Sequence, residues 1–299
     1  MLLPLVLACA TPAPEVEVRD HATVVRVALN WYPEPEFGGF YDALLTKSYR
    51  DAGLDVQIIP GGPGVPVLEM LAANKVDVAI SGADDLLLRR AKGLAAVAIL
   101  AGFQDSPVGL MVHAGGPTRF EDVTGSVAIE PGSPFQQFLW KKYGWDGKVA
   151  MVPTSGSVGA FAADPSLIQQ AYITSEPCVA EAKNVAVTFI PARDAGWNPY
   201  ASLAVVREVD AAVPWVAAFK AASMSGWKHY NADPTVANAE IARLNPDLPL
   251  DRMACIVARQ RPYVEGKDGI GVMTQTRWDE LAVAFATVGT VVTAQGAWQ

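Results

Sequence analysis

Polar and aromatic side chains follow the ends of several predicted strands, where they could bind a small molecule. The first such loop, residues 30–39, reads Asn-Trp-Tyr-Pro-Glu-Pro-Glu-Phe-Gly-Gly. Its rings can stack on a flat ligand, as can Trp197, while carboxylates, amides and hydroxyls can accept N–H bonds. The candidate ligand-binding residues are Asn30, Trp31, Glu36, Phe37, Tyr41, Ser81, Asp84, Gln104, Glu130, Ser133, Ser155, Thr174, Glu176, Asn198 and Tyr200.

These loops contain no Lys or Arg, and the nearest cation along the chain is Arg193. A site for nitrate, sulfonate or phosphate usually carries a cation, although a helix N-terminus alone can hold an anion. The loops therefore favour a neutral or weakly cationic ligand. Each residue taken alone also has a structural interpretation, because Ser133 and Asp84 can cap helices and Trp31 can pack in a core. The prediction depends on many loops meeting at one edge.

Alternating strand and helix patterns position these loops. The pattern of apolar residues predicts strands at 24–29, 54–60, 76–80 and 95–100, separated by helices. This order is typical of a mostly parallel sheet with helices on both faces. A second run of the same kind begins near Val108, and helices follow from Asp210. Ligands bind such sheets at the carboxyl ends of the strands, so we expect the site between the two units.

Two local patterns in the second unit give sharper expectations. Ser133, Gln136 and Gly144 have the spacing of an N-cap, a capping box and a helix-ending glycine. A short helix is also expected to begin at Asp164, and residues 40–49 in the first unit have the spacing of a single helix.

Composition excludes several classes of protein. The chain has 299 residues, of which 51% are hydrophobic and 18% charged, too apolar for a disordered protein. Its 31 acidic and 23 basic residues give a net charge of −8, which argues against nucleic-acid binding. The longest uncharged apolar run in the body, residues 93–103, is shorter than the roughly 20 residues of a membrane-spanning helix.

The chain has three cysteines, and the first of them ends an N-terminal segment that could be a targeting signal. Residues 6–9, Val-Leu-Ala-Cys, resemble the lipobox of bacterial lipoproteins, in which the cysteine is acylated, and residues 1–23 would then be an export signal and tether. The apolar stretch is short and lacks a basic flank, so an untargeted apolar N-terminus is the alternative. With Cys9 lipidated, Cys178 and Cys255 lie in separate apolar segments, where we expect buried free thiols. The sequence shows no zinc-binding spacing, and we expect neither metal nor cofactor.

Short motifs along most of the chain together resemble one family of periplasmic solute-binding proteins. They lie at residues 30–33, 38–41, 52–56, 60–62, 76–79, 130–132, 174–177 and 198–200. The family includes binding proteins for the thiamine pyrimidine precursor and, in a wider circle, for riboflavin, taurine, alkanesulfonates and nitrate.

The resemblance implies an α/β periplasmic binding protein fold, with two lobes joined by crossing strands that act as a hinge. Lobe 1 would comprise residues 24–106 and 202–299, and lobe 2 residues 107–201. It further implies a monomeric, non-enzymatic component of an ABC importer, with a permease and an ATPase as partners. The protein would lie in the periplasm or, through a lipid on Cys9, on the outer face of the cytoplasmic membrane.

One departure from the family pattern bears on the ligand. In the pyrimidine-precursor branch an Asn-His pair is expected where this chain has Pro35, Glu36 and Phe37. A eukaryotic relative consumes a histidine of this loop to make the pyrimidine, and Phe37 cannot supply those ring atoms. A flavin-like ligand becomes a competitor, because Phe37 adds a stacking face. The alternative is an enzyme of thiamine pyrimidine biosynthesis on the same fold, with Glu130 and Glu176 as an acid–base pair.

Overall fold

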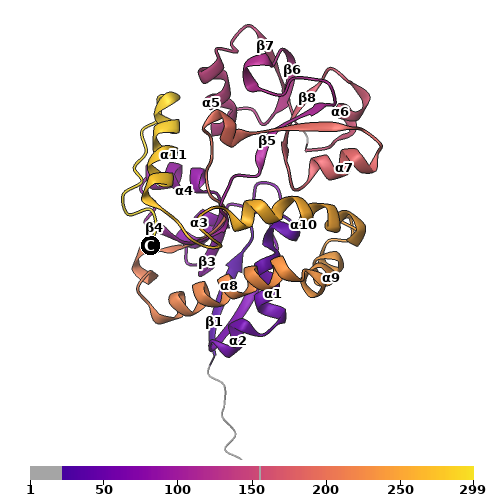
Figure 1. The fold of residues 1–299 in the computed structure, drawn as a ribbon. Helices are drawn as coiled ribbons and strands as arrows, with labels where there is room; N and C mark the ends of the chain where they lie inside the picture. The colour runs from indigo at the N-terminus through magenta and orange to yellow at the C-terminus, as the bar shows by residue number, and fades with distance from the viewer. Residues whose placement is uncertain (1–21, 155) are drawn as a thin grey trace, which may run out of the picture.

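The computed structural model describes residues 22–154 and 156–299, which form two lobes (Figure 1). Cys9 and Ser155 lie outside the described residues. Lobe 1 contains a five-stranded sheet in the order β2-β1-β3-β10-β4. Its strands are β1 (Thr23–Ala28), β2 (Leu54–Ile59), β3 (Val78–Ser81), β4 (Ala96–Phe103) and β10 (Ala201–Arg207).

Lobe 2 repeats this plan with a second five-stranded sheet, in the order β7-β6-β8-β5-β9. Its strands are β5 (Val108–His113), β6 (Gly125–Ile129), β7 (Val149–Pro153), β8 (Ile168–Tyr172) and β9 (Val187–Pro191). The predicted α/β class is confirmed, and each sheet is mixed, because β10 and β5 run antiparallel to both of their neighbours. These are the strands that enter each lobe from the other, so the chain crosses at residues 104–107 and 192–200.

Helices cover the sheets. Those of the first two sequence units are α1 (Gly38–Leu45), α2 (Ser48–Asp51), α3 (Val67–Ala72), α4 (Ala83–Arg90), α5 (Pro134–Tyr143), α6 (Gly159–Ala163) and α7 (Glu176–Ala182). The C-terminal helices are α8 (Pro214–Ala232), α9 (Thr235–Leu244), α10 (Leu250–Glu265) and α11 (Gln275–Thr287). Short 3-10 helices are η1 (Pro35–Phe37), η2 (Phe120–Asp122), η3 (Ala192–Ala195) and η4 (Glu208–Asp210). No helix in the described part of the chain is both long and apolar enough to cross a bilayer.

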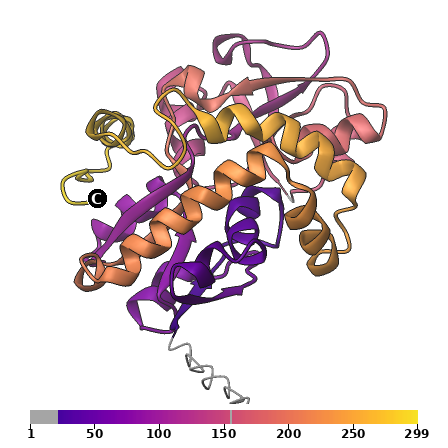
Figure 2. The ribbon, with the colours of Figure 1, turned by 60° about the horizontal axis from the view of Figure 1, so that its bottom comes forward.

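The core of lobe 1 forms where α8 packs on α1 and β4. At Gly226 a Cβ atom would collide with the Gly39 carbonyl oxygen and Ala43, so only glycine lets the two helices approach this closely. Trp227 and Phe40 are fully buried beside this contact, with their rings edge to face. Figure 2 shows α8 and α10 crossing the molecule as neighbours, with α11 standing apart.

The C-terminal segment contacts both lobes. Helix α11 packs against α5, and Phe285 meets Trp197 with ring centroids 5.2 Å apart. The chain then returns to lobe 1, where Ala98 donates to the Ala297 carbonyl and Gln299 donates to the Ala98 carbonyl.

Local sequence signals differ in how well they place helices. The capping prediction for α5 is confirmed, because Ser133 Oγ accepts from Gln136 N at 3.2 Å and Gly144 has a φ of 59°. The helix expected at Asp164 is wrong. Helix α6 ends before this residue, and Asp164 Oδ1 instead accepts from Ser166 N at 2.9 Å in a turn that leads into β8. The single helix expected over residues 40–49 is divided by Lys47, whose φ is 66°.

The expectation of two free thiols is also wrong. Cys178 of α7 and Cys255 of α10 form a disulfide, with their Cα atoms 6.0 Å apart. The two residues are 77 positions apart in sequence and lie on different sequence units, so neither spacing nor local composition reveals their proximity.

Candidate functional site

A cavity of about 500 Å³ lies between the two sheets, at the ends of strands from both lobes. Its lining contains Asn30 and Trp31 after β1, Ser81 of β3, and Glu130 after β6. The full set of candidate residues that line it is Asn30, Trp31, Glu36, Ser81, Asp84, Glu130, Ser133 and Tyr200. The convergence arises because parallel strands place their carboxyl ends at one edge of a sheet.

Trp31 is the exposed aromatic residue on the lobe 1 side of the cavity, with 40% of its surface accessible. Tyr172, at the end of β8 in lobe 2, also lines the cavity and is 39% accessible. The sequence prediction missed Tyr172, because a tyrosine at the end of a strand looks like an ordinary strand residue. Both lobes therefore present an aromatic ring that a flat ligand can reach.

Other candidate residues lie away from the cavity lining. Phe37 is fully buried in the apolar core of lobe 1, so it offers no stacking face. Tyr41 belongs to the same core and is 2% exposed. Thr174 is buried at the turn before α7. Gln104 and Asn198 lie in the crossings between lobes, described below.

Carboxylates dominate the charge in and around the cavity. The candidate Glu176 and its neighbour Glu34 are not among the lining residues, although their charges act on Glu36, which lines it. Burial and the neighbouring charges of Glu34 and Glu176 raise the pKa of Glu36 to about 8. Burial also raises the pKa of Glu176 to about 7, and burial together with Glu176 raises the pKa of Glu34 to about 7. Asp84 follows the same trend, because burial and the charge of Asp85 raise its pKa to about 6. The ligand-free cavity thus holds protons that a cation could displace.

The loop that carries Glu36 is anchored from two directions. Ser202 Oγ donates to the Glu36 carbonyl oxygen at 3.0 Å, and Gln260 Nε2 of α10 donates to the neighbouring Pro35 carbonyl at 3.1 Å. On the opposite lobe, Glu176 Oε2 accepts from the Tyr172 backbone N–H at 2.8 Å. These bonds fix the backbone of the Glu36 loop in lobe 1 and the Glu176 side chain in lobe 2, each within its own lobe. Glu34 was not among the candidate residues, although it lies in the same Pro-Glu-Pro-Glu sequence.

Cations contribute little to the lining. Arg89 is the only Lys or Arg among the described residues that line the cavity. Its guanidinium is paired with Glu69 at 2.6 Å and Asp85 at 3.2 Å, which neutralises it. No group of three His, Cys, Asp or Glu within residues 22–154 and 156–299 is arranged to hold a metal ion. The buried Asn30 Oδ1 has no hydrogen-bond partner in this part of the chain, so it is available to a ligand N–H.

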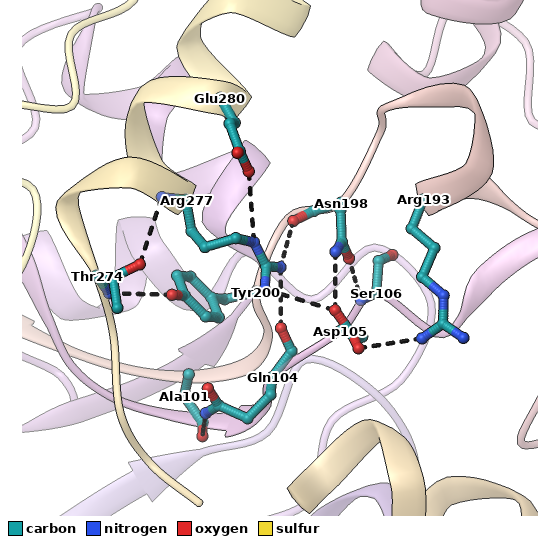
Figure 3. A network of polar contacts seen from close by, with 10 residues as sticks. All are labelled: Ala101, Gln104, Asp105, Ser106, Arg193, Asn198, Tyr200, Thr274, Arg277 and Glu280. Carbon is teal, nitrogen blue, oxygen red and sulfur yellow. Dashed lines mark hydrogen bonds and ion pairs between the residues drawn. The ribbon is translucent and has the colours of Figure 1, made fainter. Parts of the chain in front are cut away.

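A polar network clasps the two crossings beside the cavity (Figure 3). Asp105 of the first crossing accepts from Arg193 at 3.0 Å and from Asn198 Nδ2 at 2.8 Å, both on the second crossing. Asn198 Oδ1 accepts from Ser106 N at 2.8 Å. Gln104 and Asn198 thus have structural partners here.

Arg277 of α11 joins the same network. Its Nη2 donates to the Gln104 carbonyl at 2.9 Å and to the Asn198 carbonyl at 2.8 Å, so one side chain binds both crossings. Its Nη1 lies 3.5 Å from Asp105 Oδ1, and the side chain is 9% exposed. Helix α10 adds a further anchor, because the Tyr263 carbonyl accepts from Gln104 N at 2.7 Å. The crossings are therefore held by directional bonds from two C-terminal helices.

A family profile described as "NMT1/THI5 like" matches residues 34–237, which is more than half of the chain. The chain belongs to the NMT1/THI5-like family. The match includes Glu36, the carboxylates of lobe 2 and both crossings. His113 and His229, the histidines among the described residues, do not line the cavity of this family member.

Solved structures similar to this NMT1/THI5-like chain share its two-lobed periplasmic binding protein fold. The periplasmic aliphatic sulphonate binding protein SsuA from Escherichia coli is 14% identical, with a TM-score of 0.69 and 92% of each chain covered. The alkanesulfonate-binding protein SsuA from Xanthomonas axonopodis pv. citri, bound to MOPS, is 13% identical, with a TM-score of 0.67 and coverage of 93% of this chain and 98% of that one.

A third similar structure is the ligand-binding component of an ABC-type import system from Staphylococcus aureus with zinc bound. It is 12% identical, with a TM-score of 0.67 and coverage of 92% of this chain and 96% of that one. No curated protein matches the chain as a relative. At these identities the likeness concerns the fold alone, so the chemistry of the cavity must be argued from its own residues.

The Arg277 network predicts a stability effect. Replacing Arg277 with Ala removes the donor to both crossing carbonyls and leaves the Asp105 carboxylate with fewer partners. We expect a loss of about 2–4 kcal/mol in the free energy of unfolding, measured by urea denaturation. Arg243→Ala, which breaks an exposed ion pair with Glu240, is the control and should change stability far less. Equal effects of the two substitutions on the free energy of unfolding would contradict the role of Arg277 in holding the two crossings together.

The raised carboxyl pKa values predict how stability depends on pH. The folded protein holds protons on Glu34, Glu36 and Glu176 that the unfolded chain releases near pH 4.5, so this stabilisation is lost as pH rises toward about 8. The melting temperature of the ligand-free protein should therefore fall between pH 5 and pH 8, and Glu36→Gln should flatten that fall. Glu121→Gln is the control, because backbone hydrogen bonding lowers the pKa of this exposed carboxyl. If the melting temperature of the native protein fell no more steeply with pH than that of Glu36→Gln, the raised pKa of Glu36 would be refuted.

Proposed function

We propose that this chain is the substrate-binding component of an ABC importer, and that it captures a small basic aromatic heterocycle between its lobes. The observation that carries the proposal is a cavity between the lobes that is lined by carboxylates and aromatic rings. Among the described residues, its one lining cation, Arg89, is already paired. Amino N–H groups or a protonated ring nitrogen would satisfy these carboxylates and the free Asn30 Oδ1. Membership of the NMT1/THI5-like family supports the same function.

Within this class we favour an aminopyrimidine such as the thiamine pyrimidine precursor over a flavin. The case for a flavin rested on an additional stacking face at Phe37, and this side chain lies in the core. Trp31 and Tyr172 remain as the accessible rings among the described residues that line the cavity, one on each lobe. A small ring between them can donate an N–H bond to Glu36, which lines the cavity. Closure of the lobes around it would exclude water and strengthen this bond.

The sulfonate ligands of the similar structures are poorly suited to this cavity. A sulfonate is a permanent anion and would meet the carboxylates of Glu36, Asp84 and Glu130. Arg89, which could attract it, is held by Glu69 and Asp85. An enzyme of pyrimidine biosynthesis that uses a histidine in this loop is not supported either, since neither described histidine lines the cavity.

Export of the protein is part of the proposal. The disulfide between Cys178 and Cys255 is stable in an oxidising compartment and is unusual in the cytoplasm. We propose that the protein acts in the periplasm or on the outer face of the cytoplasmic membrane, attached through a lipid on Cys9. An importer permease and ATPase would be its partners there.

Ligand identity is tested by native mass spectrometry of the purified protein and by thermal shift with a defined panel. The thiamine pyrimidine precursor should raise the melting temperature, whereas MOPS and nitrate should not. Trp31→Ala should weaken binding about tenfold because a stacking face is lost, and Trp31→Phe should restore much of it. Glu36→Gln should weaken binding by a similar factor or more. A saturable shift with MOPS or nitrate, and none with the pyrimidine, would overturn the proposed ligand class.

Anchoring is tested separately with labelled fatty acid in a bacterial host that expresses the chain behind an adequate start. We expect label on the wild-type chain and none on Cys9→Ser, because the thiol is the acceptor for the lipid. Cys9→Ser should then be recovered in the soluble fraction. A wild-type product that is exported without label would contradict the lipid anchor while leaving the cavity chemistry unaffected.

A further inference from the structure

The Cys178–Cys255 disulfide joins the two lobes. Helix α7 lies between β8 and β9 of lobe 2, whereas α10 contacts β4 and η1 of lobe 1. Cys178 is 3% exposed and belongs to the same apolar cluster as Met253 and Ile256 of α10. Arg259 of α10 also pairs with Glu181 of α7. One side of the cleft is therefore closed by a covalent bond and an ion pair, and Figure 1 shows α10 running beneath α7.

Helix α10 also contacts the loop that carries Glu36. Gln260 is fully buried and donates to the Pro35 carbonyl, one residue before Glu36. Tyr263, nearer the end of the helix, accepts from the backbone N–H groups of Gln104 and Asp105 in the first crossing. The same helix therefore fixes the glutamate loop of lobe 1, one crossing and, through Cys255, a helix of lobe 2.

Glu176 lies in the first turn of that lobe 2 helix, two residues before Cys178. Glu36 and Glu176 come from opposite lobes, and like charges repel more strongly where water is excluded. A hinge that moved freely would let this pair separate. The bond from Cys178 to α10 opposes that movement close to Glu176 itself.

We propose that the Cys178–Cys255 disulfide is a covalent bracket across the lobe boundary that holds Glu176 beside Glu36 and thereby sets the geometry for cation binding. Cys178 and Cys255 act as positioning residues, since neither lines the cavity. This inference rests on the proposed capture of a basic ligand.

The titratable groups around Glu36 and Glu176 come from several elements of both lobes. Glu34 precedes η1, Asp84 lies in the first turn of α4, Glu130 follows β6, and Tyr172 ends β8. Desolvation of its hydroxyl and the charges of Glu36, Asp84, Glu176 and Glu130 raise the pKa of Tyr172 above its ordinary value, so this hydroxyl stays neutral beside them. The charged pair nearest the disulfide, Arg259 and Glu181, is already compensated.

The test follows the glutamate carboxyl carbons by ¹³C NMR during a pH titration of the ligand-free protein, labelled at the glutamate side-chain carboxyl. Glu36→Gln and Glu176→Gln assign the two signals. In the oxidised protein these signals should titrate near the raised values given above for the two residues. After reduction with a phosphine, and in Cys178→Ser/Cys255→Ser, both midpoints should move by about one unit or more toward the ordinary value of roughly 4.3.

Matched controls separate the bracket from general packing. Arg259→Gln removes the adjacent ion pair but keeps the disulfide, and its midpoints should match those of the native protein. Reduced protein that is re-bridged through a methylene group between the two sulfurs should recover the raised midpoints. If circular dichroism shows that reduction unfolds the protein, the methylene-bridged form is used instead. Raised titration midpoints of Glu36 and Glu176 in that form support the bracket, and ordinary midpoints refute it.

The outcomes also separate this inference from the proposed function. Raised midpoints that persist in folded, reduced protein would overturn the bracket and leave the acidic cavity intact. Ordinary midpoints in the oxidised protein would remove the basis for binding a basic ligand and with it the bracket. A thermal shift by the thiamine pyrimidine precursor that is equal in oxidised and reduced protein would likewise contradict the bracket but support the proposed function.

Discussion

The relative position of the two lobes depends on Asp105, a carboxylate shared between both crossings. It lies on the first crossing and accepts from Arg193 and Asn198 on the second. Arg277 completes the contact from α11 by binding a backbone carbonyl on each crossing. Charged hydrogen bonds are strong and directional, so this cluster fixes how two separately built sheets face one another. The cavity lies between the two sheets whose relative orientation this cluster helps to fix.

The cavity itself works against the stability of the ligand-free protein. Burial and mutual repulsion disfavour ionised Glu34, Glu36 and Glu176 in the absence of a cation. The free energy that offsets this cost comes mainly from apolar packing elsewhere, such as that of Trp227 of α8 against Phe40 of α1. Perturbed carboxyls of this kind are concentrated at functional sites, where a ligand relieves the repulsion. Stability and binding chemistry are thus assigned to different parts of the molecule.

Sequence reasoning worked where the signal was local and failed where it depended on tertiary contact. The cap at Ser133 and the convergence of strand-end loops follow from short-range rules, and both were predictable. Phe37 was misjudged because η1 turns its ring into the core, which its neighbours in sequence do not reveal. Asn198 has the right chemistry for a ligand but is engaged by Asp105 and Ser106. The disulfide could not be foreseen, because its two cysteines are 77 positions apart in sequence and lie on helices that only the tertiary fold brings together.

The bond between α7 and α10 has a practical consequence for anyone preparing this protein. Cytoplasmic thiols are kept reduced, so recombinant material recovered from an ordinary cytoplasmic expression host would lack this cross-link or contain it in part of the sample. Such a preparation is a mixture of two chemical species, and any titration or binding curve would average them. Secretion into an oxidising compartment, followed by thiol quantification, gives a homogeneous sample in which one species is measured.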